Sequence, residues 1–134
     1  APQIKVLREG CIMEEYDDEN IFAKILRREI PYKEIYEDEY ALAFEDINPQ
    51  APQHVLVIPK GPYISLDDFT SIASSEEIAG FFRAVGETAR LLNLAEPGYR
   101  ILANIGSDGM QEVPHMHVHI FGGKRLGPML KSNL

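Results

Sequence analysis

Residues 115 to 121 read His-Met-His-Val-His-Ile-Phe, an alternation of polar and apolar side chains. Successive side chains on a β-strand point to opposite faces. A strand over residues 113 to 121 therefore places the three imidazoles on one face and Met116, Val118 and Ile120 on the other. The apolar face can cover a core. The imidazole face indicates a site of chemistry, because neighbouring imidazoles repel one another when charged.

The three histidines allow three interpretations. They can be surface residues of a half-exposed strand. They can bind a metal ion, because His-x-His on one strand supplies two zinc ligands. The outer pair lies about 13 Å apart at about 3.3 Å per residue, so such a site needs a further ligand, for example His54 or Asp46. They can also catalyse phosphorus chemistry, because a neutral imidazole, with an unperturbed pKa of about 6.5, can attack phosphorus and form an intermediate that water discharges.

The remaining pattern predicts an α+β domain with a largely antiparallel sheet, because the expected helices and strands do not alternate strictly along the chain. Apolar runs, most of them alternating, predict strands over residues 33–37, 41–45, 54–59 and 99–105 in addition to 113–121. The run 54–59 is mostly apolar, which is typical of a central strand buried on both faces.

Two helices are expected. The first begins after Asn20, a favourable N-cap residue, and is stopped by Pro31. The second begins near Ser74, which stands three residues ahead of a glutamate, the spacing of a capping box. Gly80 and Gly86 each weaken this helix by about 1 kcal/mol relative to alanine, unless they allow another element to approach closely.

Length and composition predict one domain in a reducing compartment. The chain has 134 residues, of which 45% are hydrophobic. We expect residues 20–134 to form a single domain and the acidic residues 1–19 to form a mobile lead-in. The formal net charge of −8 argues against a nucleic-acid partner, and no apolar run approaches the roughly 20 residues that span a membrane. A single cysteine, Cys11, and no visible secretory signal favour a cytoplasmic protein.

The stretch 115–121 resembles the His-φ-His-φ-His-φ-φ signature of the histidine triad (HIT) superfamily, in which φ is an apolar residue. Further blocks resemble, in the same order, the Hint branch of this superfamily; they are residues 21–31, 46–52, 54–60 and 122–130. The resemblance covers about residues 20 to 130. It implies a HIT-like fold, with a five-stranded sheet and two main helices, that joins a second copy into one sheet across a homodimer.

The resemblance also implies an enzyme that needs no metal or other cofactor and whose partner is a purine nucleotide of the AMP or GMP type. The expected substrates are purine nucleoside 5′-phosphoramidates, such as AMP joined to an amine or to lysine, and also acyl adenylates. Hydrolysis would pass through a nucleotidyl-histidine intermediate. Glu112 stands where animal Hint proteins have a serine, which favours a cationic leaving amine such as lysine.

The resemblance assigns roles by position. His117 would be the nucleophile, His119 would bond phosphate oxygens or the leaving group, and His115 would orient its neighbours. His54 would complete the cluster from the adjacent strand, and Asp46 would hold the ribose hydroxyls. The other expected contacts are Phe22, Ile25, Phe44 and Ile47 around the base and Asn104, Gln111 and Val113 at the phosphate end. Helical spacing alone also fits a plain core role for the first two.

Two other functions stay open. A dinucleoside polyphosphate hydrolase of the Fhit branch would use the same triad. A nucleotide-binding or scaffold module would have only incidental catalysis. The blocks that flank the triad favour the phosphoramidate hydrolase over the polyphosphate hydrolase.

Overall fold

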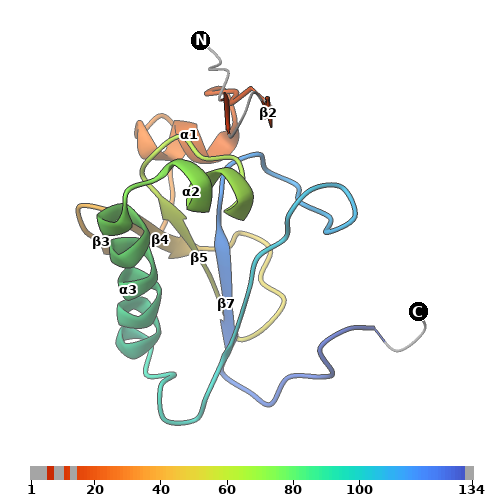
Figure 1. The fold of residues 1–134 in the computed structure, drawn as a ribbon. Helices are drawn as coiled ribbons and strands as arrows, with labels where there is room; N and C mark the ends of the chain where they lie inside the picture. The colour runs from red at the N-terminus through yellow and green to blue at the C-terminus, as the bar shows by residue number, and fades with distance from the viewer. Residues whose placement is uncertain (1–5, 8–10, 13–14, 132–134) are drawn as a thin grey trace.

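Five antiparallel strands form the sheet at the centre of the molecule (Figure 1). The structure is a computed structural model that describes residues 6–7, 11–12 and 15–131. The strand order is β3-β4-β5-β7-β6. The bounds are Glu34–Glu37 for β3, Ala41–Glu45 for β4, Gln53–Pro59 for β5, Arg100–Leu102 for β6 and Val118–Gly122 for β7. A separate two-stranded ribbon pairs β1, Val6–Leu7, with β2, Cys11–Ile12. The α+β class and the antiparallel five-stranded sheet are thus confirmed.

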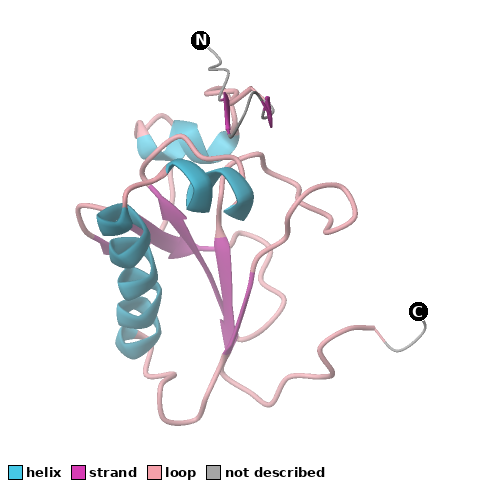
Figure 2. Cartoon of the chain, in the orientation of Figure 1, coloured by secondary structure: helices cyan, strands magenta, loops and turns pink. Residues whose placement is uncertain are grey.

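Three helices accompany the sheet: α1 (Ile21–Leu26), α2 (Leu66–Ile72) and α3 (Ser75–Leu91). The long α3 lies along one face of the sheet, while α1 and α2 lie near one end of it (Figures 1 and 2). The sequence did not predict α2, whose seven residues offer only two turns of helical periodicity. None of the helices in the described part of the chain is both long and apolar enough to cross a membrane.

Strands β4 and β5 are buried on both faces, which the run 54–59 predicts for β5. On β5, Val55 and Val57 belong to the core beneath α3, whereas Leu56 and Ile58 belong to a second core on the opposite face, with Phe22 of α1. Strand β4 divides its side chains in the same way. The period of two along each strand therefore builds two cores, and the second of them adjoins the candidate site.

The helix caps largely follow the sequence signals. The Asn20 side chain accepts from the Ala23 backbone N–H at 2.9 Å, and Ser74 forms the expected capping box at the start of α3. The stop assigned to Pro31 is wrong, since α1 already ends at Leu26. Arg28 has a φ of 62°, in the left-handed region, so the chain leaves the helix before the proline.

Two strand predictions were too long. The expected strand 113–121 begins only at Val118 and extends to Gly122, and the expected strand 99–105 is limited to Arg100–Leu102. The N–H of Met116 donates to the Tyr63 carbonyl at 2.8 Å, so this part of the chain bonds outside the sheet. The first two histidines of the motif therefore lie ahead of the strand and only His119 lies in it.

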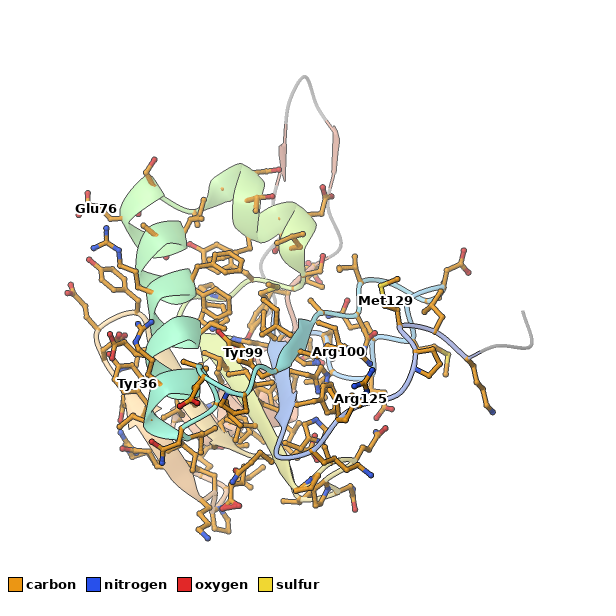
Figure 3. The ribbon with its side chains drawn as sticks, turned by 90° about the horizontal axis from the view of Figure 1, so that it is seen from below. Tyr36, Glu76, Tyr99, Arg100, Arg125 and Met129 are labelled. Carbon is orange, nitrogen blue, oxygen red and sulfur yellow. The ribbon has the colours of Figure 1, made fainter. Side chains whose placement is uncertain are left out.

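The chain beyond β7 runs past the edge strand β6. The guanidinium of Arg100 donates to the carbonyl oxygens of Gly127, at 2.7 Å, and Pro128, at 3.4 Å. Arg100, Arg125 and Met129 accordingly lie on the same side of the molecule in Figure 3. The expected lead-in of residues 1–19 lies largely outside the described residues, and its mobility stays a prediction there; Tyr16, which the structure describes, is buried instead.

The two glycines of α3 are expected to respond in opposite directions to alanine. A Cβ on Gly80 would lie 2.2 Å from Cδ2 and 2.5 Å from Cγ of Tyr40, so Gly80→Ala should lower the free energy of unfolding by about 1–3 kcal/mol. At Gly86 the nearest atom is the flexible Arg90 guanidinium, at 3.4 Å. Gly86→Ala is the matched control and should raise the free energy of unfolding by about 0.5–1 kcal/mol. Urea unfolding measures both, and equal effects would contradict the close approach of Tyr40.

Candidate active site

A cavity of about 580 Å³ opens between α1, the end of β4 and the chain that leads into β7. Two of its walls differ in chemistry. The predicted site residues that line it are Phe22, Ile25, Phe44, Asp46, Ile47, Asn104, Val113, His117 and His119. The cavity thus has an apolar part, formed by side chains of α1 and β4, and a polar part, formed by imidazoles, an amide and a carboxylate.

His117 presents an unprotonated ring nitrogen. Its Nδ1 lies 2.6 Å from the carbonyl oxygen of His115, and because a carbonyl only accepts, Nδ1 carries the proton. The lone pair is then on Nε2. Burial lowers the pKa of His117, against the opposing effects of the bond to the carbonyl and of Asp46 and Glu112. A neutral imidazole with a fixed lone pair is the form that attacks an electrophile.

His119 carries its proton on Nε2, because of two hydrogen bonds that begin at the Gln50 backbone. The Gln50 backbone N–H donates to Nδ1 of His54 at 3.1 Å, so the proton of neutral His54 is on Nε2. That N–H faces Nδ1 of His119 at 2.9 Å. His119 therefore accepts at Nδ1 and keeps its own proton on Nε2. The cluster offers one lone pair, from His117, and one N–H donor, from His119.

The imidazoles are held neutral by burial. Burial, together with the neighbouring His117 and His54, lowers the pKa of His119 to about 4, while Asp46 opposes the shift. Burial also lowers the pKa of His54, again against Asp46. Loss of hydration thus outweighs the nearby carboxylate at each ring, which keeps the lone pairs available near neutral pH.

Asp46 lines the cavity and lies beside the hydrogen-bonded pair of His54 and His119. Its Oδ1 accepts from the Asn48 backbone N–H at 2.8 Å, and its Oδ2 lies 3.4 Å from Nε2 of His54. Among the described residues, Asp46, His54 and His119 each offer a possible metal-ligand atom, all within 4.8 Å of one another. The nitrogens of the two histidines face each other in a hydrogen bond, so a metal ion would have to replace that bond.

The apolar part of the cavity is shared with the second core. Phe22, Ile25 and Phe44 are buried core residues and also line the cavity, so the core role of the two helical residues is confirmed and their contact with a base stays a prediction. Phe22 meets Phe44 edge to face at 5.6 Å and His117 at 5.0 Å. Ile47 lines the cavity but is 85% exposed, so none of the residues that the structure describes covers most of its surface.

Three of the predicted residues lie behind the cavity rather than in it. His54 does not line it but contacts three residues that do, namely His119, Asp46 and Phe121. His115 is fully buried, with Nδ1 2.6 Å from the Tyr16 hydroxyl and Nε2 2.9 Å from the Pro59 carbonyl. The Gln111 amide accepts from the Gly106 N–H and donates to the carbonyls of Ile64 and Val113, so it joins the loop 106–113 to the segment ahead of α2.

Sequence reasoning missed several side chains of the site. Phe121 lines the cavity, stacks on His119 at an interplanar angle of 7° and lies 4.2 Å from the His54 ring centroid. A signal was available, because position 121 has the same strand parity as the three histidines. Met110 lines the cavity as well, beside Glu112, to which the sequence already pointed. No local signal pointed to Tyr16, which is 99 residues away from His115.

Comparison with known proteins places the chain in a family. A model of the HIT domain matches residues 27–126. A 13.2 kDa HIT-like protein of Azospirillum brasilense is 64% identical over 115 residues, which are 86% of this chain and 94% of that protein. The purine nucleoside phosphoramidase of Escherichia coli is 42% identical over 113 residues, 84% of this chain and 94% of that protein.

Solved structures agree with this family. A histidine triad protein from Clostridium difficile superposes with a TM-score of 0.78 at 40% identity, covering 88% of this chain and all of that one. A HIT family hydrolase from Clostridium thermocellum gives a TM-score of 0.78 at 36% identity, covering 86% and 99%. The chain therefore belongs to the HIT family, as the resemblance of residues 115–121 indicates.

The neutrality of the cluster predicts an unusual titration. An ordinary histidine titrates near pH 6.5, whereas His119 should stay neutral down to about pH 4. The unfolded chain then binds more protons than the native protein between these values. The free energy of unfolding should therefore fall as the pH decreases from about 6.5 towards 4. Imidazole NMR signals followed against pH test this, and a His119 that titrates near 6.5 would contradict it.

Proposed function

We propose that this protein hydrolyses purine nucleoside 5′-phosphoramidates through a nucleotidyl-His117 intermediate. The observation that carries the proposal is the pairing of a fixed lone pair on His117 with an N–H donor on His119, both in one cavity that has an apolar part beside them. The E. coli relative named as a purine nucleoside phosphoramidase supports the nucleotide and the bond that is cleaved.

The geometry suggests how each half of the reaction proceeds. Nε2 of His117 attacks phosphorus and forms a P–N bond to the protein, while the P–N bond to the leaving amine breaks and the amine takes up one proton from solvent. Water then attacks the same phosphorus, the bond from phosphorus to Nε2 of His117 breaks, the nucleotide leaves with the hydroxyl of the water, and the other proton of the water returns to solvent. The Nε2–H of His119 donates to a phosphoryl oxygen, where negative charge is greatest in the transition state.

The remaining walls fit the rest of the nucleotide. A purine has two apolar faces, which the aromatic and aliphatic side chains of α1 and β4 can cover. The Asp46 carboxylate can accept from two ribose hydroxyls. Glu45, Asp46 and Glu112 line the cavity, and no lysine or arginine does so among its described residues. An amine that carries positive charge, such as lysine, is therefore the leaving group we propose.

Removing the nucleophile should abolish turnover and leave the binding of the nucleotide intact. We expect His117→Ala to release no amine from adenosine 5′-phosphoramidate, while its dissociation constant for AMP stays within a few-fold of the wild type. Acid quenching of the wild type with labelled substrate should trap AMP on the protein, and the variant should trap none. Chelator should leave the wild-type rate unchanged, because no step passes through a metal ion.

The same assay separates the other functions. Turnover by His117→Ala within about tenfold of the wild type would exclude the nucleophile assigned here. Loss of wild-type activity with chelator would favour a metal site at Asp46, His54 and His119. Cleavage of a diadenosine polyphosphate without amine release would favour the polyphosphate hydrolase. A folded, AMP-binding protein that cleaves neither would be a binding module.

The ribose contact can be tested by a double-mutant cycle between protein and ligand. Asp46→Ala should weaken AMP binding by about 1–3 kcal/mol. The wild type should bind the 2′,3′-dideoxy analogue of AMP about as weakly as Asp46→Ala binds AMP. Asp46→Ala should bind this analogue only slightly more weakly than the wild type does. Calorimetric titration measures the four affinities. Additive losses would mean that Asp46 acts through His54 rather than through the ribose.

The homodimer implied by the resemblance and the cytoplasmic location favoured by the single cysteine remain proposals of their own. Sedimentation of the purified protein decides the first. Neither enters the chemistry described above, which uses side chains of one chain only.

A further inference from the structure

We propose that Tyr16 is a positioning residue for the nucleophile, acting on His117 through His115. The inference rests on the proposed function, because it concerns the same His117. It adds a group that lies outside the matched domain, since the HIT domain model begins at residue 27. Tyr16 belongs instead to the segment ahead of α1.

Tyr16 holds the first histidine of the motif at one of its two ring nitrogens. The Pro59 carbonyl can only accept, so Nε2 of His115 carries the proton in their 2.9 Å contact. Nδ1 of His115 then accepts from the Tyr16 hydroxyl, 2.6 Å away. The Asn20 amide donates to the same hydroxyl at 3.1 Å, which leaves the hydroxyl proton directed at His115. Both nitrogens of His115 are thus engaged.

The position of His115 sets the position of His117. The His115 carbonyl accepts from Nδ1 of His117 at 2.6 Å and so fixes both the tautomer and the orientation of the nucleophilic ring. During attack on phosphorus the His117 ring becomes positively charged, and this hydrogen bond then strengthens. A shift of His115 would therefore misdirect Nε2 of His117 and weaken the stabilisation of the ring in the transition state.

The contact between Tyr16 and His115 is buried, and Asn20 connects it to α1, which forms part of the apolar wall of the cavity. The Tyr16 side chain is 4% exposed and packs with Ala23 and Ile64. Asn20 also caps α1, the helix that carries Phe22 against the edge of His117. Tyr16 and Asn20 therefore hold His115, which orients His117, in a fixed position relative to α1.

The test removes only the hydroxyl of Tyr16. Tyr16→Phe keeps the packed ring and removes the hydrogen bond to His115. We expect kcat for adenosine 5′-phosphoramidate to fall about tenfold while KM changes less than about twofold, because the alignment of the attacking nitrogen is lost and the nucleotide contacts are kept. The matched control is Tyr36→Phe, which removes the hydroxyl of a half-buried tyrosine on β3 that donates to Asp38 at 2.9 Å. The control should leave kcat within about twofold.

Nitrogen-15 NMR of the imidazoles gives a readout that does not depend on turnover. In the wild type, Nδ1 of His115 should show the shift of a hydrogen-bonded acceptor, and in Tyr16→Phe that shift should move towards the value of a free imidazole nitrogen. The Nδ1 proton of His117 should also move. In Tyr36→Phe both signals should stay in place.

Three other outcomes would overturn the inference. Unchanged His115 signals in Tyr16→Phe would mean that the contact does not hold the ring. Changed signals with an unchanged kcat would mean that the contact exists but does not position His117. An equal loss of kcat in both variants would mean a general loss of stability. A wild type with no phosphoramidase activity would instead refute the proposed function, while the NMR comparison would still show whether Tyr16 holds His115.

Discussion

The hydrogen bond from Nδ1 of His117 to the His115 carbonyl connects the chemistry of this protein to its backbone. That carbonyl is available because His115 lies ahead of β7, where the Met116 N–H bonds to Tyr63 instead of joining the strand ladder. A regular strand would direct these backbone groups sideways to its neighbours. The departure of the chain from the sheet thus gives one histidine a fixed tautomer, and the orientation of the site follows from it.

The site also depends on a balance between burial and charge. The chain carries a net charge of −8, and Asp46 acts to raise the pKa of each of the three histidines His54, His117 and His119. Burial acts in the opposite direction and dominates at every one of them. Two oriented hydrogen bonds, from the Gln50 N–H to His54 and from His54 to His119, suit the neutral rings. Each donor and acceptor that joins these three residues therefore has a partner when the rings are uncharged.

The two cores of the fold separate support from binding. The core beneath α3 is built from alternate residues of the central strands and has no part in the cavity. The second core, with Phe22, Ile25 and Phe44, has one side open to it. Packing that stabilises the sheet therefore also forms the apolar wall, which explains why helical spacing alone did not distinguish a core role from a binding role.

The sequence by itself determined the class of fold, the strands of the central sheet, the caps of α1 and α3 and the identity of the histidine cluster. These features depend on alternation, helical period and capping, which are read within a few residues. Only the tertiary structure decided that the motif enters the sheet at Val118, that Gln111 reaches the Ile64 carbonyl, that His54 pairs with His119 and that Tyr16 reaches His115. The last two contacts join residues 65 and 99 positions apart. A hydrogen bond over such a separation depends on where the folded backbone brings its two ends, and no local pattern in the sequence encodes it.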